Sequence, residues 1–305
     1  FLDSSCVIKC YAKASIITLE EKMATILIAG CGDLGSGLGH ELVSQGHNVI
    51  GIRRTGVEFP AGVIGITGDL VTMEGSALPD VDIIFLIMTP KGRTEEAYRT
   101  AYFNTAQALI RRYQSQSKPP QIFFISSTSV YGESQGEWID ETTPAQPKSA
   151  TSSILRETEF ALTSVFPTVA VRCSGIYGSG RFRLLQKIES GEDWGANSWT
   201  NRIHRDDVVS ALVTLAECAV AGKALPNQVI VTDQTPVSMW EVKLWLATCL
   251  GVTPAIKNVH DFIPASGKRI QGQYLSLQGW RPRYPSYVSG YQSLLLEYKN
   301  EGNLS

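Results

Sequence analysis

The sequence predicts an α/β fold: a doubly wound parallel sheet of the Rossmann type with a small C-terminal substrate-binding cap. Short apolar runs without strict polar alternation recur between helix-like segments from residue 24 to about residue 231. Such runs are typical of parallel strands that helices cover on both faces. The first run leads directly into the turn Gly30-x-Gly32-x-x-Gly35, and a helix-like pattern follows. Right-handed crossovers between such strands place a ligand at the carboxyl ends of the strands.

The expected strands and helices alternate along the chain. The first strand is the apolar run before Gly30, the second follows a turn at Gly46, and the fourth includes most of the longest apolar run, Ile83–Met88. By the same criteria, strands are expected at 24–30, 48–52, 63–66, 82–87, 121–126, 168–172 and 228–231, and helices at 34–45, 94–114, 151–165, 181–190, 206–220 and 238–249. After the last helix we expect loops rich in Pro, Gly and Tyr.

Composition excludes several classes of function. The 305 residues are 43% hydrophobic and 18% charged with a net charge of −2, which indicates a globular protein without the basic surface of a nucleic-acid or membrane binder. The longest apolar run is far shorter than the ~20 residues that cross a bilayer. The cysteines show no C-x-x-C spacing, so we expect a reduced, cytoplasmic protein without a structural metal. They are Cys6, Cys10, Cys31, Cys173, Cys218 and Cys249.

The glycine-rich turn is expected to bind a diphosphate. A strand, a tight turn and a helix N-terminus bring main-chain N–H groups and the positive end of a helix dipole to one point. The flanking strand and helix are the context that this motif requires. The residues expected to hold the diphosphate are Gly30, Gly32, Asp33, Leu34 and Gly35.

Arg53 and Arg54 follow the second strand, where dinucleotide-binding proteins select their cofactor. An acidic residue about 20 positions after the turn holds the ribose 2′-hydroxyl of NAD, whereas arginine suits the 2′-phosphate of NADP. A hydrogen bond from guanidinium to phosphate contributes about 1.5–3 kcal/mol. We therefore expect NADP, with NAD less favoured; the alternative is a solvated arginine pair at a strand end.

The chain is thus expected to comprise three parts. Residues 1–22 lack the continuous apolar core of a signal peptide, and we expect an N-terminal extension of no assigned function. The expected dinucleotide-binding Rossmann domain comprises 23–173 and 203–233, and the expected cap comprises 174–202 and 234–305.

Several further segments follow one another in the order seen in one known family. They are Gly68-Asp69-Leu70, Ile125-Ser126-Ser127-Thr128-Ser129-Val130-Tyr131-Gly132, Val171-Arg172-Cys173-Ser174-Gly175-Ile176-Tyr177-Gly178, Asn201-Arg202-Ile203-His204-Arg205-Asp206-Asp207-Val208 and Gly279-Trp280-Arg281-Pro282. Together with the glycine-rich turn, they resemble the extended short-chain dehydrogenase/reductases, or NAD-dependent epimerase/dehydratase-like proteins. The Gly-x-Gly spacing departs from the Gly-x-x-Gly-x-x-Gly of most extended members and is closer to the atypical branch.

The resemblance implies further cofactor contacts. Asp69 would accept a hydrogen bond from the adenine amino group, with Leu70 beside the ring, although a Gly-Asp pair is also common in ordinary turns. Met88 and Thr89, at the end of the fourth strand, would lie near the nicotinamide ribose, unless they only close the strand. Ser126, at the end of the fifth strand, is also expected to be a cofactor-binding residue.

The resemblance supplies only half of the usual catalytic set. Ser127 occupies the Ser/Thr position that follows the fifth strand, although such a hydroxyl can also bond locally at a strand end. The family's Tyr-x-x-x-Lys places a phenol and an ammonium on one helix face, which makes the phenol a general acid or base. Alignment of Glu159 with the family's helix glutamate puts Thr151 and Leu155 at these two positions.

Other proton sources are therefore left open: Tyr98, Tyr177, water or the substrate itself. In the segment that begins at His204, we expect an aspartate to cap a helix starting near Val208. A metal or catalytic role for His204 is the minor alternative.

These observations predict an NADP-binding, oxidoreductase-like protein that acts on a small polar or sugar-like substrate. Arg181 and Arg202 are candidates for binding an anionic group of that substrate. Two alternatives stay open: a non-catalytic NADP-binding redox sensor or scaffold, and an epimerase with a tightly held cofactor. By analogy with the family, helices 94–114 and 151–165 would form the interface of a homodimer.

Overall fold

The computed structural model describes residues 23–56, 58–257 and 262–301, so the expected extension at 1–22, with Cys6 and Cys10, lies outside the described residues. Seven strands form one sheet in the order β11-β7-β5-β4-β1-β2-β3, and every neighbouring pair is parallel. These strands are β1 (Thr25–Ala29), β2 (Asn48–Arg53), β3 (Ile64–Thr67), β4 (Ile83–Leu86), β5 (Gln121–Ser127), β7 (Thr168–Cys173) and β11 (Gln228–Val231). The predicted fold class is confirmed.

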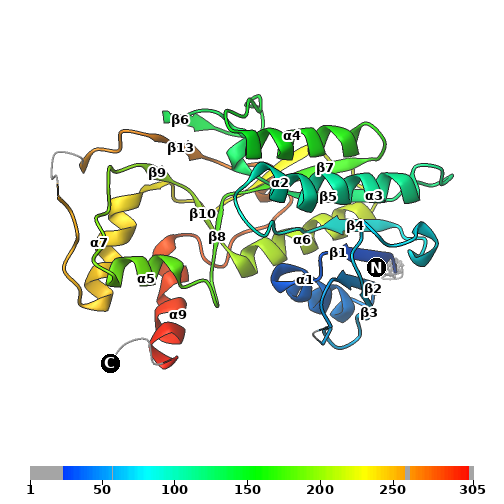
Figure 1. Ribbon diagram of the computed structural model, residues 1–305, viewed down its shortest axis with the longest axis horizontal. Helices are drawn as coiled ribbons and strands as arrows, with labels where there is room; N and C mark the ends of the chain where they lie inside the picture. The colour runs from blue at the N-terminus through cyan, green and yellow to red at the C-terminus, as the bar shows by residue number, and fades with distance from the viewer. Residues whose placement is uncertain (1–22, 57, 258–261, 302–305) are drawn as a thin grey trace, which may run out of the picture.

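Helices cover both faces of this sheet (Figure 1). On one face lie α1 (Asp33–Ser44) and α6 (Arg205–Val220), and on the other α3 (Asn104–Tyr113) and α4 (Ala150–Thr163). Successive strand residues point to opposite faces, so Ile28 packs in one core and its neighbour Ala29 in the other. Burial on both faces is the reason the strands are continuous apolar runs in the sequence.

The expected helix 94–114 is interrupted. It consists of α2 (Glu95–Tyr98), a π-helical segment (Arg99–Phe103) and α3. Thr94 caps the start, because its hydroxyl accepts a hydrogen bond from the Ala97 N–H. A π-helical insertion shifts the helix face without breaking the chain of helical residues, and periodicity alone does not reveal it.

The cap lies at one end of the sheet (Figure 1). A separate hydrophobic core holds together α5 (Arg183–Glu189), α7 (Met239–Leu250) and α9 (Tyr287–Asn300). Short strands connect this region to the sheet: β8 (Gly175–Tyr177) pairs with β10 (Arg202–His204), β9 (Trp199–Thr200) with β12 (Val237–Ser238), and β13 (Gly267–Ile270) with β6 (Gln135–Ile139). The division into domain and cap that the sequence suggests stays a prediction.

The expectation of only loops after residue 249 is wrong. A short helix α8 (Tyr274–Leu277) and the 14-residue α9 follow. The buried positions Tyr287, Tyr291, Leu294 and Tyr298 of α9 recur with helical spacing and face the cap core. Much of this buried face consists of tyrosine side chains. A Tyr-rich composition therefore does not by itself indicate a loop.

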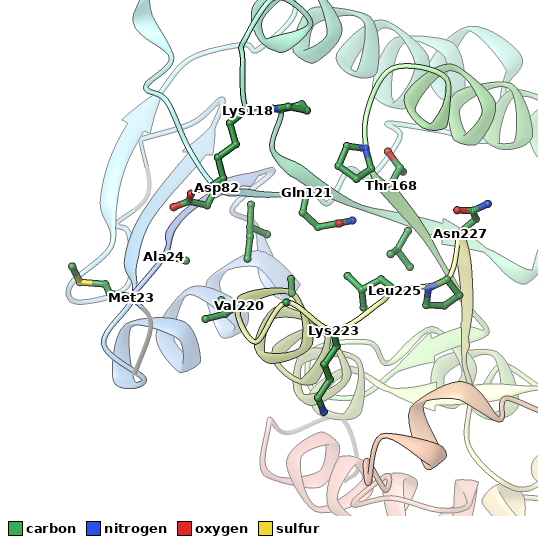
Figure 2. Close-up of a pocket in the computed structure, with 17 residues that line it drawn as sticks. Met23, Ala24, Asp82, Lys118, Gln121, Thr168, Val220, Lys223, Leu225 and Asn227 are labelled. Carbon is green, nitrogen blue, oxygen red and sulfur yellow. Dashed lines mark hydrogen bonds and ion pairs between the residues drawn. The ribbon is translucent and has the colours of Figure 1, made fainter. Parts of the chain in front are cut away.

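Two hollows lie away from the glycine-rich turn. One, of about 650 Å³, is at the amino ends of the strands, where Lys118 and Asp82 form an ion pair of 2.9 Å at its edge (Figure 2). The other, of about 510 Å³, lies beside the end of β11 and is lined by Asp233 and Trp280. Ligands of doubly wound sheets bind at the carboxyl ends near the point where strand order reverses, so neither hollow has the position of the expected site. None of the described helices is long and apolar enough to span a membrane.

Candidate functional site

The turn after β1 is tightly folded between the two neighbouring strands. Gly30 has a φ of +100°, a conformation that favours glycine. Its N–H and that of Cys31 both donate to the Ile52 carbonyl oxygen of β2, at 3.0 and 2.8 Å. On the other side, a Cβ on Gly30 would lie 1.9 Å from the Ile87 carbonyl oxygen. The first glycine is therefore required by the turn, at the point where the strand order reverses between β4, β1 and β2.

The other two glycines have different roles. Gly32 is the N-cap position of α1, where no described side chain caps the helix, and a Cβ added to it would meet nothing within 4 Å. A Cβ on Gly35 would lie 2.5 Å from the Gly30 carbonyl oxygen. A tight turn, an open approach to the backbone, and close packing of helix on strand are the three glycine roles of a dinucleotide-binding turn. These residues fit a bound diphosphate.

The ends of β2 and β3 meet beside this turn. Gly68 N–H donates to the Arg53 carbonyl oxygen at 2.9 Å, which brings Asp69 next to Arg53. The Arg53 guanidinium lies 4.2 Å over the Phe59 ring, and its Nη1 donates to the Cys31 carbonyl oxygen at 3.4 Å. Arg54 is exposed. Two arginine side chains thus lie at the end of β2.

The residues expected to contact the adenine and the nicotinamide ribose differ in their exposure. Asp69 is exposed, and its Oδ1 accepts from the Val71 N–H at 3.0 Å, so it stabilises a local turn with one oxygen. Leu70 is buried in the core. Met88 is half-buried with its sulfur near Gly30, and Thr89 is exposed. The predicted adenine contacts of Asp69 and Leu70, and the ribose contacts of Met88 and Thr89, stay predictions.

The two serines at the end of β5 point to different partners. Ser126 is buried, and its hydroxyl donates to Glu159 Oε1 at 2.7 Å. Ser127 is half-buried, and its Oγ accepts from the Ser129 N–H at 3.1 Å. The Ser126 hydroxyl is therefore engaged by helix α4, and its predicted cofactor role would have to use other atoms. The Ser127 hydroxyl proton stays available to a substrate oxygen.

A buried ion pair lies directly beneath these serines. Arg172 of β7 donates from Nε and Nη2 to the two oxygens of Glu159, at 3.1 and 2.7 Å, and from Nη1 to the Tyr131 hydroxyl at 3.0 Å. Burial alone would lower the pKa of Arg172, but Glu159 reverses this and raises it, whereas burial raises the pKa of Tyr131. This ion pair was missed at the level of sequence, although an arginine inside an apolar strand is a signal that a buried counter-charge must lie nearby.

Comparisons with known proteins decide the family. Residues 26–226 match the NAD dependent epimerase/dehydratase family. The chain belongs to this family. It is 31% identical over 215 residues to Protein YeeZ of Escherichia coli K12, which covers 66% of this chain and 76% of that protein.

Solved structures agree. A candidate NAD-dependent epimerase/dehydratase from Methylobacillus flagellatus is 33% identical, with a TM-score of 0.73 over 91% of this chain and 99% of that one. The UDP-glucuronic acid 4-epimerase of Bacillus cereus, in complex with NAD, has the same TM-score and the same coverage at 18% identity. At that identity the second likeness shows the fold alone.

The catalytic tyrosine and lysine of the family have no counterpart on α4. Thr151 is half-buried with its Oγ1 3.2 Å from Ser149 Oγ, and Leu155 is 2% exposed within the core. Of the open proton sources, Tyr177 is buried in the cap, where burial raises its pKa and its hydroxyl donates to the Ser286 carbonyl oxygen at 3.4 Å. Tyr98 is half-buried and packs on Tyr102. Neither tyrosine matches the family's phenol position.

The expected aspartate cap of α6 is wrong. The helix begins at Arg205, three residues before Val208, and the His204 Nδ1 accepts from the Asp206 N–H at 3.3 Å. Burial lowers the pKa of His204, which keeps the acceptor nitrogen unprotonated. Asp207 is buried and accepts instead from the N–H groups of Arg283 and Tyr284, at 2.6 and 3.0 Å. His204 and Asp207 of this segment therefore have structural roles in this chain.

The two arginines expected to face the substrate lie in different surroundings. Arg202 is buried in the cap and donates to the Tyr291 hydroxyl at 3.0 Å. Arg181 forms an ion pair with Asp33, the first residue of α1, at 2.7 Å. Within the described ranges, no group of three or more His, Cys, Asp or Glu residues could hold a metal ion.

Proposed function

We propose that this protein binds a pyridine dinucleotide at the turn of β1 and α1 and acts as an oxidoreductase on a small polar or sugar-like substrate. The open backbone at Gly32, on an uncapped helix N-terminus, carries this proposal. The family match supports it, since it is to the NAD dependent epimerase/dehydratase family, and a structural neighbour with the same fold, the Bacillus cereus epimerase, was solved in complex with NAD. Isothermal titration calorimetry with NADPH, NADP, NADH and NAD tests it directly. A folded protein that binds none of them would refute it.

NADP is the proposed cofactor, although the structure of the Bacillus cereus epimerase contains NAD. The support is Arg53, fixed over Phe59 at the end of β2, together with Arg54. Arg53→Asp is expected to weaken NADPH binding by about tenfold or more, from the loss of a charged hydrogen bond of about 1.5–3 kcal/mol, and to leave NADH binding intact. Equal weakening of both nucleotides would contradict the assignment.

Ser127 is the proposed catalytic residue. The nicotinamide would supply hydride transfer, while the protein orients the reacting groups. Because Ser127 Oγ accepts from the Ser129 N–H, its proton can be donated to a substrate hydroxyl or carbonyl oxygen. With Thr151 and Leu155 at the usual Tyr and Lys positions, a second protein acid or base at these positions is not proposed.

One observation favours a second candidate function. Because Leu155 is part of the core, α4 offers no ammonium beside the cofactor, and a non-catalytic NADP-binding sensor or scaffold needs none. An epimerase with tightly held cofactor would use the same residues. NADPH absorbance across a panel of carbonyl compounds and sugars, followed by product analysis by NMR, separates the three. Turnover that Ser127→Ala abolishes supports an enzyme, and tight binding without turnover supports the sensor.

Two further expectations belong to this proposal. The described cysteines are free thiols, and Cys31, Cys173 and Cys218 are buried, which favours a reducing, cytoplasmic location. A homodimer would use α2, α3 and α4, which lie side by side on one face (Figure 1). Phe160 of α4 is 69% exposed on these helices, an apolar side chain that a second copy would cover.

A further inference from the structure

Asp33 joins the cofactor turn to two arginines from distant parts of the chain. Its Oδ2 accepts from Arg181 Nη2 at 2.7 Å, and its Oδ1 lies 2.9 Å from Arg205 Nη2. Arg205 Nη2 also donates to the Asp33 carbonyl oxygen at 3.2 Å. Arg181 precedes α5 in the cap, and Arg205 is the first residue of α6. Two guanidinium groups are therefore held at the N-terminus of α1.

These arginines lie beside the open side of the turn. Gly32 and Asp33 are both exposed, and a Cβ on Gly37 would lie 3.4 Å from Arg205 Nη2, so this guanidinium follows the first turn of α1. The Arg181 side chain is 38% exposed and that of Arg205 19% exposed. Both can present further N–H donors to a ligand, since a guanidinium carries five.

The charges around the arginines nearly balance. Arg205 Nη1 donates to Asp206 Oδ1 at 2.8 Å, so two carboxylates accompany the two guanidinium groups. A carboxylate at the first position of a helix is favoured by the dipole, but it also lies where a diphosphate would be repelled. The arginines offset that repulsion and add the planar donor groups that bind phosphate.

The Arg181 segment is fixed at a second point. Ser179 Oγ and the Gly180 N–H both donate to Glu297 Oε1 of α9, at 2.8 and 3.1 Å. The loop that carries Arg181 thus bridges the cap helix α9 and the cofactor turn. A ligand that contacts Arg181 would therefore contact both parts of the molecule.

We propose that Asp33 positions Arg181 and Arg205 as a clamp, in which these two guanidinium groups bind the diphosphate of the dinucleotide opposite the main-chain amides of α1. This inference rests on the proposed function. The competing explanation is a purely structural latch, in which the Asp33–Arg181 pair only attaches the cap to the Rossmann domain and the Asp33–Arg205 pair only joins α1 to α6. The two explanations differ in the sign of the effect of removing the carboxylate.

Calorimetry on the full chain separates them. The probes are NADPH, ADP-ribose, which retains the diphosphate, and adenosine 2′-monophosphate, which lacks it. Arg181→Gln is expected to weaken NADPH and ADP-ribose by about tenfold and to leave adenosine 2′-monophosphate unchanged. Asp33→Asn keeps an acceptor for the arginines and removes the repelling charge, so its affinity for ADP-ribose should equal or exceed that of the wild type.

Arg183→Gln is the matched control. Arg183 is exposed at the start of α5 and is not an ion-pair partner of Asp33 in the described chain, so all three affinities should stay at the wild-type value. Thermal melting confirms that each variant is folded. If Arg181→Gln does not fold, Arg205→Gln is used in its place, and the same changes in affinity are expected.

Three results have distinct meanings. Weaker ADP-ribose binding in Arg181→Gln, together with unchanged or tighter binding in Asp33→Asn, supports the clamp. Equal weakening by both variants, or no change in Arg181→Gln, overturns the clamp and leaves the proposed function standing. A folded wild type that binds neither NADPH nor NADH removes the proposed function, and the clamp with it.

Discussion

Replacement of Gly32 by alanine separates cofactor binding from folding. The added Cβ would meet no atom within 4 Å, and the Gly32 backbone (φ −88°, ψ −145°) is not in the left-handed region that favours glycine, so alanine adds no side-chain clash there. The free energy of unfolding should change by less than about 1 kcal/mol. The same Cβ would occupy the space where a phosphate approaches the amides of α1. Loss of two charged hydrogen bonds, about 1.5–3 kcal/mol each, should raise the Kd for NADPH by about 100-fold or more.

Gly35→Ala is the matched comparison. Its Cβ would lie 2.5 Å from the Gly30 carbonyl oxygen, so α1 must move away from β1, at a cost of about 1–3 kcal/mol in unfolding free energy. Calorimetry gives the Kd of each variant, and urea denaturation gives its stability. If Gly32→Ala binds NADPH as the wild type does, the diphosphate does not lie at this turn. If Gly32→Ala is as unstable as Gly35→Ala, the space around Gly32 is not open.

Three other predictions concern stability and assembly. Burial raises the pKa of Asp233 to about 7 from 3.8, so the folded protein binds more protons than the unfolded one between these pH values, and stability falls as pH rises through this window. Asp233→Asn should remove that slope and stabilise the protein at pH 8 by up to about 4 kcal/mol; a parallel pH profile for both proteins would count against it. Glu159→Gln leaves Arg172 buried without a counter-charge and should lower the unfolding free energy in urea by about 3–5 kcal/mol, and a near-neutral effect would show that water reaches the pair. Sedimentation should show a dimer that Phe160→Asp converts to a monomer, whereas a monomeric wild type excludes the interface.

The sheet and the cofactor turn could be predicted because both are local. Each strand of a sheet covered on both faces is a continuous apolar run, and its ends follow from the flanking turns. The roles of Gly30 and Gly35 follow from the motif spacing and the strand and helix on either side. The family resemblance then ordered the remaining segments, and the family match over 26–226 confirms it.

The contacts that complete the site could not be predicted because they join distant segments. Asp33 pairs with arginines 148 and 172 positions away. His204 caps α6, although an aspartate two residues later is the more common capping residue. In each case the choice between equivalent side chains depends on which backbone groups the tertiary fold presents, and a single sequence does not contain that information.

The packing of α4 explains why the usual catalytic Tyr and Lys are difficult to accommodate on this helix. Glu159 and Leu155 lie one helical turn apart, and both face the sheet, where Glu159 binds Arg172 and Leu155 fills the core. A lysine at position 155 would have to bury an ammonium in that core, at a cost of several kcal/mol unless a carboxylate met it. Restoring the usual catalytic pair would therefore require a rearranged helix as well as two substitutions. The helix that follows the glycine turn, α1, packs in the core on the other face of the sheet, so the structure of the turn does not depend on whether α4 supplies an acid.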